Sequence, residues 1–261
     1  MKKIITVLLL CLLCGCGAQR VSLETGALSN DMQGWGFRKM PGGRPEFTEK
    51  QREDMEKYGC IYEGAGGDKS IYLTFDEGYE NGYTEPILDV LKENGVRAAF
   101  FITGPYMKEH ADIVDRMVKE GHIVGNHTVN HPSLPSKSEK EIKKEIEELD
   151  GMYAKRYNSH MKYIRPPMGE YSERTLFITK NMGYTNVFWS FAYRDWEVDN
   201  QKGAAFALSE FKNNLHDGAV ILLHAVSKDN AAALGDMIKY AKDSGYEFKS
   251  LDEFKFEKGT N

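Results

Sequence analysis

From residue 70 onward, apolar positions follow two alternating periods along the chain. Short runs rich in β-branched and aromatic residues predict strands, and each is followed by a segment with apolar residues at helical spacing. The predicted strands cover residues 70–75, 97–103, 122–125, 162–165, 184–190, 219–223 and 246–249. The predicted helices cover residues 84–94, 111–120, 138–157, 172–182, 202–215 and 230–244, after a short helix around residues 46–58.

Start and stop signals support these helices. Ser138 and Glu141 form a capping box at the start of the longest one, and Gly95, Gly121 and Gly245 each follow a predicted helix end. Nearly continuous apolar strands that alternate with helices indicate an α/β fold with a parallel sheet covered on its outer face. We therefore expect a closed or nearly closed barrel of about seven βα units. An open doubly wound sheet is the alternative, although no G-x-G-x-x-G sequence follows the first strand.

Composition narrows the class of protein. The chain has 261 residues, of which 41% are apolar and 28% charged, as is ordinary for a globular domain. The formal net charge of −5 lacks the basic excess of nucleic-acid-binding proteins, so we expect no nucleic-acid partner. No apolar run reaches the roughly 18 to 20 residues that a membrane-spanning helix requires.

The first residues have the features of an export signal. Lys2 and Lys3 precede the apolar stretch 4–13, and residues 13–16 resemble a bacterial lipobox that ends at Cys16. We expect residues 1–17 to form a lipoprotein-type signal peptide, with Cys16 as the lipid attachment site and the protein anchored extracytoplasmically to the cell membrane. An ordinary signal peptide cut nearby is the alternative.

The remaining chain divides by composition into three predicted segments. Polar residues 18–33 predict a tether, residues 34–68 an N-terminal cap segment, and residues 69–257 the domain of alternating strands and helices. Cys60 is the only cysteine beyond the signal, and no nucleophile motif surrounds it. We interpret Cys60 as a buried structural residue.

Polar residues that can support chemistry follow several predicted strands. They are Asp76, Glu77, His127, His131, Arg165, Asp195 and His224. Because the carboxyl ends of parallel strands meet on one rim of a barrel, we expect these side chains to lie together. Each one alone also has a structural interpretation, as a turn acid, a surface ion pair or a core histidine. Since Pro132 prevents a helix through His127 and His131, that pair is compatible with a divalent metal ion.

Five short motifs occur in a fixed order: TFDEG at 74–78, HTVNH at 127–131, RPPMG at 165–169, DW at 195–196 and LLH at 222–224. Together they resemble the signature of the polysaccharide deacetylases, the NodB-like proteins of carbohydrate esterase family 4. Within that family, further stretches such as 78–84 and 222–230 are similar to sporulation peptidoglycan deacetylases that act on N-acetylmuramic acid and lead to muramic δ-lactam. The resemblance covers residues 35–257 and implies a distorted (β/α) barrel.

The resemblance also implies a metal site. His127 and His131 would hold one divalent ion together with a carboxylate, which here falls on Glu77, whereas the family usually has Asp at that position. Two histidines and a carboxylate favour zinc, while manganese, magnesium and cobalt remain alternatives.

The family pattern assigns roles to the other motif residues. Asp76 would be the general base, with Arg165 orienting it and keeping it ionised. His224 would be the general acid, and Asp195 would pair with a cation on the rim and help to hold His224 protonated. Trp196 and Leu222 would shape the acetyl pocket, and Tyr79 and Asn81 would contact the substrate.

These assignments describe a hydrolase of carbon–nitrogen bonds other than peptide bonds. Its expected partner is the peptidoglycan glycan strand, and we expect a monomer. Deacetylation of another surface glycan, similar to chitin or xylan, is one alternative. The other is a lipid-anchored glycan-binding pseudoenzyme, which would not need the general acid that His224 provides.

Overall fold

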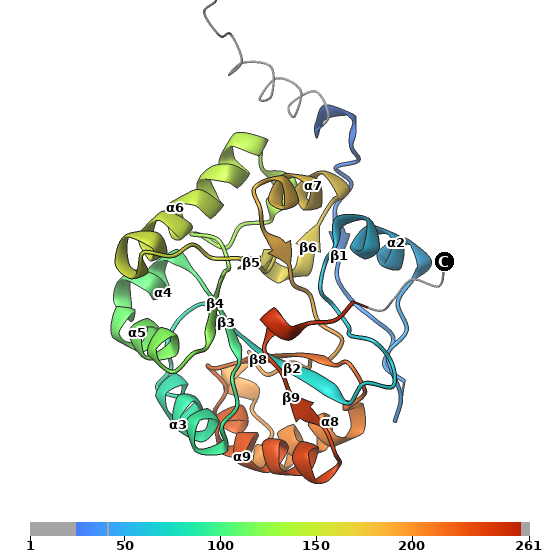
Figure 1. Ribbon diagram of the computed structural model, residues 1–261, viewed down its shortest axis with the longest axis vertical. Helices are drawn as coiled ribbons and strands as arrows, with labels where there is room; N and C mark the ends of the chain where they lie inside the picture. The colour runs from blue at the N-terminus through green and yellow to red at the C-terminus, as the bar shows by residue number, and fades with distance from the viewer. Residues whose placement is uncertain (1–24, 41, 257–261) are drawn as a thin grey trace, which may run out of the picture.

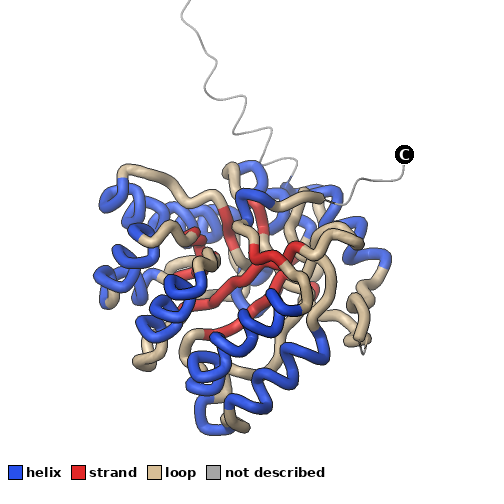
Figure 2. The backbone as a smooth tube through the Cα atoms, turned by 60° about the horizontal axis from the view of Figure 1, so that its bottom comes forward, coloured by secondary structure: helices blue, strands red, loops and turns tan. Residues whose placement is uncertain are grey.

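The computed structural model describes residues 25–40 and 42–256, which form a curled parallel sheet inside a ring of helices (Figures 1 and 2). The sheet follows the order β7-β5-β4-β3-β2-β8, and β9 pairs with β2 off this path. Its strands are β2 (Ser70–Glu77), β3 (Ala99–Ile102), β4 (Ile123–Asn126), β5 (Tyr163–Ile164), β7 (Thr185–Asn186), β8 (Val220–His224) and β9 (Glu247–Phe248). All of their pairings are parallel, which confirms the predicted α/β class.

Helices cover the outer face of the sheet (Figure 2), and their apolar side chains pack on the strands. They are α2 (Glu49–Tyr58), α3 (Thr84–Asn94), α4 (Gly104–Glu109), α5 (Ala111–Lys119), α6 (Glu139–Tyr157), α7 (Glu173–Asn181), α8 (Ala204–Asn214) and α9 (Lys228–Asp243). Short 3-10 turns span Leu134–Ser136, Pro167–Gly169, Val198–Asn200 and Leu251–Glu253. Within the described ranges, no helix combines the length and apolar character needed to cross a membrane.

The helix signals in the sequence are confirmed, and one helix was missed. Ser138 and Glu141 form the predicted capping box of α6, and Gly95 ends α3 in the left-handed conformation. Helix α4 lies where no helix was predicted. The sequence does contain a start signal for α4, because Thr103 caps the helix and Pro105 lies in its first turn.

Two of the strands differ from the prediction in ways that affect the site. Strand β2 extends through Asp76 and Glu77, so these acids lie within the strand rather than after it. The strand predicted at 184–190 is only two residues long. Beyond it the chain pairs through single bridges, Val187 with Ile61 and Phe191 with Ile221, because it leaves β5 and turns toward β8.

The N-terminal segment fills the gap between β7 and β8. Ile61 donates its N–H to Asn186 O over 2.8 Å and accepts from Phe188 N over 2.7 Å, and Gly64 N donates to Gly218 O over 2.8 Å. In Figure 1, α2 accordingly lies in the helical ring next to α7. Residues 34–68 are therefore part of the barrel wall and not a separate cap, because single backbone pairings replace a further strand there.

The segment predicted as a tether also belongs to the folded unit where it is described. Thr25 Oγ1 donates to Glu139 over 2.8 Å, and Asn30 Oδ1 accepts from Ser172 Oγ over 2.9 Å. Strand β1 (Gln33–Gly34) pairs with β6 (Glu170–Tyr171) in a small antiparallel sheet. The prediction of a tether over residues 25–33 is therefore wrong, because these residues bind to the domain. The predicted signal peptide and Cys16 lie outside the described residues.

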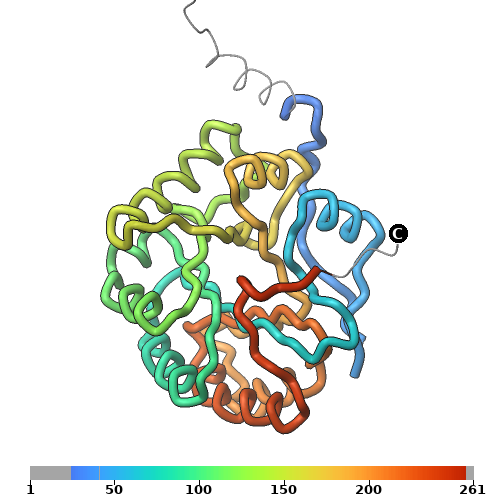
Figure 3. The backbone as a smooth tube through the Cα atoms, viewed as in Figure 1, coloured from blue at the N-terminus to red at the C-terminus, as the bar shows by residue number. Residues whose placement is uncertain are grey.

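An aromatic cluster joins the N-terminal segment to the barrel. The Trp35 ring stacks on Phe47 at 5.2 Å between centroids and lies 4.7 Å from Phe188, and Trp35 Nε1 donates to Trp189 O over 2.8 Å. Cys60 is buried in this cluster with a free thiol, as predicted. The C-terminal segment lies beside the chain that enters β2, so both ends of the domain lie against the barrel (Figure 3).

Candidate active site

Strand β2 presents two adjacent acids to opposite faces of the sheet. In register, Asp76 lies between Phe101 of β3 and His224 of β8. Because successive side chains of a strand alternate between faces, Asp76 and Glu77 cannot share one site as neighbours in a turn could. Asp76 lines the interior cavity, whereas Glu77 is completely buried.

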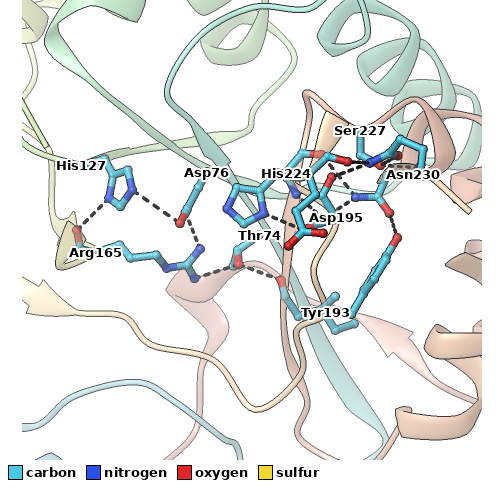
Figure 4. Close-up of polar contacts among 12 residues, drawn as sticks. Thr74, Asp76, His127, Arg165, Tyr193, Asp195, His224, Ser227 and Asn230 are labelled. Carbon is cyan, nitrogen blue, oxygen red and sulfur yellow. Dashed lines mark hydrogen bonds and ion pairs between the residues drawn. The ribbon is translucent and has the colours of Figure 1, made fainter. Parts of the chain in front are cut away.

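Asp76 is held by a buried arginine from the end of β5. Arg165 Nη1 donates to Asp76 Oδ1 over 2.7 Å, and Arg165 Nη2 donates to Thr74 Oγ1 over 2.8 Å (Figure 4). The guanidinium carbon lies 4.2 Å from the centroid of the Phe101 ring. Burial alone would raise the pKa of Asp76, but Arg165 and, less strongly, His127 lower it below its usual value. The contact predicted between Arg165 and Asp76 is confirmed.

Two imidazoles converge beside Asp76. His127 Nε2 lies 3.1 Å from His131 Nε2 and 3.5 Å from Asp76 Oδ2. His127 Nδ1 lies 2.9 Å from Arg165 O, and since a carbonyl can only accept, Nδ1 carries the proton and Nε2 presents a lone pair. Burial lowers the pKa of His127 to about 4 and also lowers that of His131, so both rings are neutral at pH 7.

The loop after β4 adopts unusual backbone angles in order to place these rings. Thr128 and His131 both have positive φ, 66° and 54°, which is uncommon for residues other than glycine. Asn126 Oδ1 accepts from Thr128 N over 2.8 Å, and Thr128 Oγ1 accepts from His131 N over 3.0 Å. Such strain persists where the surroundings enforce it, typically at functional sites.

Glu77 does not join the histidines. Neither of its carboxylate oxygens has a hydrogen-bond partner among the described residues. Burial, followed by the charges of Glu80 and Asp76, raises the pKa of Glu77 well above its usual value, which favours the neutral carboxyl. Within residues 25–40 and 42–256, no three His, Cys, Asp or Glu side chains are grouped as a metal site. The structure therefore brings together His127 and His131 but leaves out the third ligand that the sequence suggested.

His224 faces the cavity from the end of β8. Its Nδ1 lies 2.8 Å from Asp195 Oδ1, and its backbone N donates to Asp195 Oδ2 over 2.7 Å. Burial would lower the pKa of His224, but the neighbouring Asp195 carboxylate raises it above its usual value. Asp195 forms no ion pair with a lysine or arginine in the described part of the chain, so the predicted cation partner is replaced by His224 itself.

These groups share one cavity of about 760 Å³, which is lined by Asp76, His127, His131, His224, Tyr79, Leu222 and Trp196. A second cavity of about 640 Å³ adjoins it along Trp196, Leu222, Met168 and Trp189. The Trp196 side chain is 48% exposed, and its ring lies 5.4 Å from that of His224. Exposed apolar groups at a groove indicate a binding site.

One predicted contact residue lies elsewhere. Asn81 lines neither cavity, and its Nδ2 donates to Val226 O over 2.9 Å, so it supports the loop after β8. Sequence reasoning also missed Thr74 and Met168 as site residues. Thr74 precedes Asp76 by two positions, and strand alternation could have placed both on the inner face. Met168 has a positive φ of 58°, and its sequence gives no signal of this.

Comparison with known proteins agrees with this geometry. Residues 63–187 match the polysaccharide deacetylase family. The chain is 44% identical over 237 residues to the Bacillus subtilis peptidoglycan-N-acetylmuramic acid deacetylase PdaA, covering 90% of each chain. It is 49% identical over 239 residues to an uncharacterized 30.6 kDa protein of Geobacillus stearothermophilus, covering 91% of this chain and 90% of the other.

The fold gives the same relationship. The solved structure of Bacillus subtilis PdaA, a family 4 carbohydrate esterase, superposes with a TM-score of 0.85 at 42% identity, covering 87% of this chain and 98% of that one. Deacetylases of this family generally depend on a divalent metal ion. Similarity in sequence and in fold extends over most of the chain and includes the strand ends that carry the site. The chain therefore belongs to the polysaccharide deacetylase family.

Proposed function

We propose that this protein is a metal-dependent N-deacetylase of peptidoglycan that acts on N-acetylmuramic acid. The observation that carries the proposal is a single cavity in which one group has a lowered pKa and another a raised pKa. The lowered pKa of Asp76 suits a general base, and the raised pKa of His224 suits a general acid. The name of the similar Bacillus subtilis enzyme supports the choice of sugar.

The donor chemistry of the site fits a divalent ion. Two neutral imidazoles direct Nε2 atoms toward each other at 3.1 Å, and the bond from His127 Nδ1 to Arg165 O fixes one ring in the metal-binding tautomer. His127 and His131 would hold the ion, for which zinc is our first choice, ahead of manganese, magnesium or cobalt. When bound, such an ion activates a water molecule and polarises the acetyl carbonyl.

The base step depends on the free oxygen of Asp76. Oδ1 is occupied by Arg165, while Oδ2 lies on the cavity side near His127. Oδ2 accepts a proton from the attacking water as the water oxygen bonds to the acetyl carbon. Because Arg165 keeps Asp76 ionised, this acceptor is available well below neutral pH.

The acid step depends on His224. Its Nδ1 faces Asp195, which leaves Nε2–H as the donor on the cavity side. As the carbon–nitrogen bond breaks, Nε2 gives its proton to the departing sugar nitrogen, and acetate and a free amine result. The amine of a muramic residue lies beside its own lactyl carboxylate, so a later condensation of these two groups, with release of water, would give the six-membered δ-lactam of spore cortex.

The muramic lactyl group is an anion and needs a nearby cation. Arg194 and Lys202 line the second cavity, whereas Lys228, which follows the LLH motif, lies exposed at the start of α9 and lines neither cavity. Lys202 has no acidic partner within the described ranges, and its Nζ lies 4.7 Å from the Phe206 ring centroid. We place the lactyl carboxylate near Arg194 and Lys202.

Acetate release from peptide-stripped peptidoglycan by metal-loaded protein tests the function. We expect mass spectrometry of the digested product to show acetyl loss on muramic residues, and chelation followed by metal return to stop and restore the reaction. Acetyl loss confined to glucosamine residues would overturn the substrate assignment. Full activity in metal-free protein would overturn the metal assignment, and no acetate from any glycan would favour a binding protein.

We further propose that Cys16 carries a lipid that anchors the protein extracytoplasmically to the cell membrane. The support is the basic and apolar sequence before Cys16. Labelling of cells with a fatty-acid analogue should mark the natural protein but not a Cys16→Ala variant. Equal labelling of both would exclude Cys16.

A further inference from the structure

Behind the His224–Asp195 pair lies a buried amide that the reaction does not touch. Asn230, in the first turn of α9, is completely buried. Its Nδ2 donates to Asp195 Oδ2 over 2.6 Å and reaches His224 O at 3.3 Å. Its Oδ1 accepts a hydrogen bond from the Tyr193 hydroxyl. Figure 4 shows the chain of contacts from Tyr193 through Asn230 and Asp195 to His224.

From these contacts we infer that Asn230 is a positioning residue that fixes the Asp195 carboxylate and, through it, the general acid His224. This inference rests on the proposed deacetylase function. Asp195 Oδ1 faces the His224 ring, while Oδ2 accepts from His224 N and Asn230 Nδ2. With both oxygens engaged, the carboxylate cannot turn without breaking bonds in a buried site.

Tyr193 determines which end of the amide faces Asp195. Burial and the Asp195 charge raise the pKa of Tyr193, so the hydroxyl keeps its proton and donates. It therefore requires the oxygen of Asn230 on its side, which leaves the NH₂ group for Asp195. A flipped amide would set two oxygens against each other at Asp195.

The His224 ring has need of this support. Its side chain is 21% exposed at a strand end, and Asp195 is the only carboxylate that hydrogen-bonds to it within the described ranges. Proton transfer to an amine requires Nε2 within hydrogen-bond reach of the sugar nitrogen. Loosening of Asp195 therefore slows breakage of a carbon–nitrogen bond, whose amine needs a proton, more than breakage of an ester whose leaving group needs none.

The test compares two substrates in Asn230→Leu, which keeps the branched shape of the side chain and removes its three hydrogen bonds. One is a peptide-stripped glycan, and the other is 4-nitrophenyl acetate, whose phenolate leaves without a proton. We expect kcat for the glycan to fall about tenfold with KM unchanged, while aryl acetate cleavage changes less than about twofold. Equal loss on both substrates, or loss on neither, would overturn the inference.

Asn186→Leu is the matched control. Asn186 is also an almost completely buried asparagine, but its Nδ2 donates to Thr179 Oγ1 over 2.7 Å, on the side of α7. This variant should lose thermal stability and keep the ratio between the two substrates. In a His224→Gln background, Asn230→Leu should cause no further loss, because groups that act through one another are not additive. An additive loss would assign Asn230 a separate role.

Tyr193→Phe keeps the inference testable if Asn230→Leu does not fold. It removes one hydroxyl and should lower the glycan-to-aryl-acetate ratio about two- to threefold. An unchanged ratio contradicts positioning through Asn230. If natural protein releases acetate from glycans and the ratio does not move, only the inference fails. If natural protein cleaves the aryl ester but no glycan, the proposed function fails with it.

Discussion

The two halves of the site stabilise groups of opposite charge, a carboxylate in one half and a protonated imidazole in the other. On one side Asp76 lies inside a central strand, and Arg165, with an exposed fraction of 0%, holds it ionised. On the other side His224 lies at a strand end, and Asp195 from a loop holds it protonated. The first half is built from β2 and the residue that follows β5, and the second from the last residue of β8 and the loop that follows β7.

This contrast shows how one cavity provides a base and an acid at the same pH. A buried cation lowers the pKa of the acid group Asp76, and a buried anion raises the pKa of the imidazole His224. The sheet gives the base a fixed position. The acid depends instead on a series of side-chain hydrogen bonds that runs through Asn230 of α9 to Tyr193.

The largest expected effect is loss of the base. Asp76→Asn removes the proton acceptor, and we expect turnover of glycan to fall by about 10²- to 10⁴-fold. His127 and His131 remain in place, so metal content measured by mass spectrometry should not change. A variant that loses its metal along with its activity would show that Asp76 is a ligand.

The second-largest effect is expected for Arg165, which forms the ion pair with Asp76. Arg165→Met leaves Asp76 buried without its cation, which costs about 3–5 kcal/mol and lowers Tm by about 10 °C in a domain of this size. The pKa of Asp76 rises, so the acid limb of the activity profile moves to higher pH. Lys162→Met, at an exposed ion pair, is the control and should change neither Tm nor profile. An unmoved acid limb in Arg165→Met would contradict the role of Arg165.

The acid half should respond at the other end of the pH range. Asp195→Asn removes the charge that raises the pKa of His224, so the alkaline limb of activity moves to lower pH. At pH 7.5 we expect about a tenfold loss of kcat, with a smaller loss at lower pH, where a larger fraction of His224 is protonated. A pH-independent loss would indicate that Asp195 acts only by orienting the ring.

Much of this site follows from strand ends alone. Asp76, His127, Arg165 and His224 meet because parallel strands deliver their carboxyl ends to one rim. The segment that fills the gap in the barrel could not be predicted in the same way, since Ile61 pairs as a single residue without any strand pattern. The contact between Asn230 and Asp195 could not be predicted either, because it joins a helix to a loop 35 residues away in the sequence.

Glu77 shows that two residues adjacent in the sequence need not belong to the same site. Adjacent acids suggest one shared site, yet within a strand neighbouring side chains face apart. Asp76 has polar partners and a lowered pKa, whereas Glu77 has a raised pKa and its side chain has no hydrogen-bond partner among the described residues. Acid-to-amide substitution at each position, Asp76→Asn and Glu77→Gln, should therefore have different effects on turnover.

The smallest effect on turnover is expected for Glu77→Gln. A protonated carboxyl and an amide have similar shapes, so activity and metal content should stay within about twofold of the natural protein. Stability should differ in its pH dependence. Because the folded protein holds the pKa of Glu77 above its unfolded value, the natural protein loses stability as pH rises past about 4.5, and the variant does not. In denaturant unfolding, the free energy of unfolding of Glu77→Gln should therefore increase relative to that of the natural protein as pH rises. Asp76→Asn should behave in the opposite way, because the pKa of Asp76 is lowered in the folded protein. Its free energy of unfolding should be smaller than that of the natural protein above about pH 4. Loss of bound metal in Glu77→Gln would instead show that Glu77 turns inward to join His127 and His131.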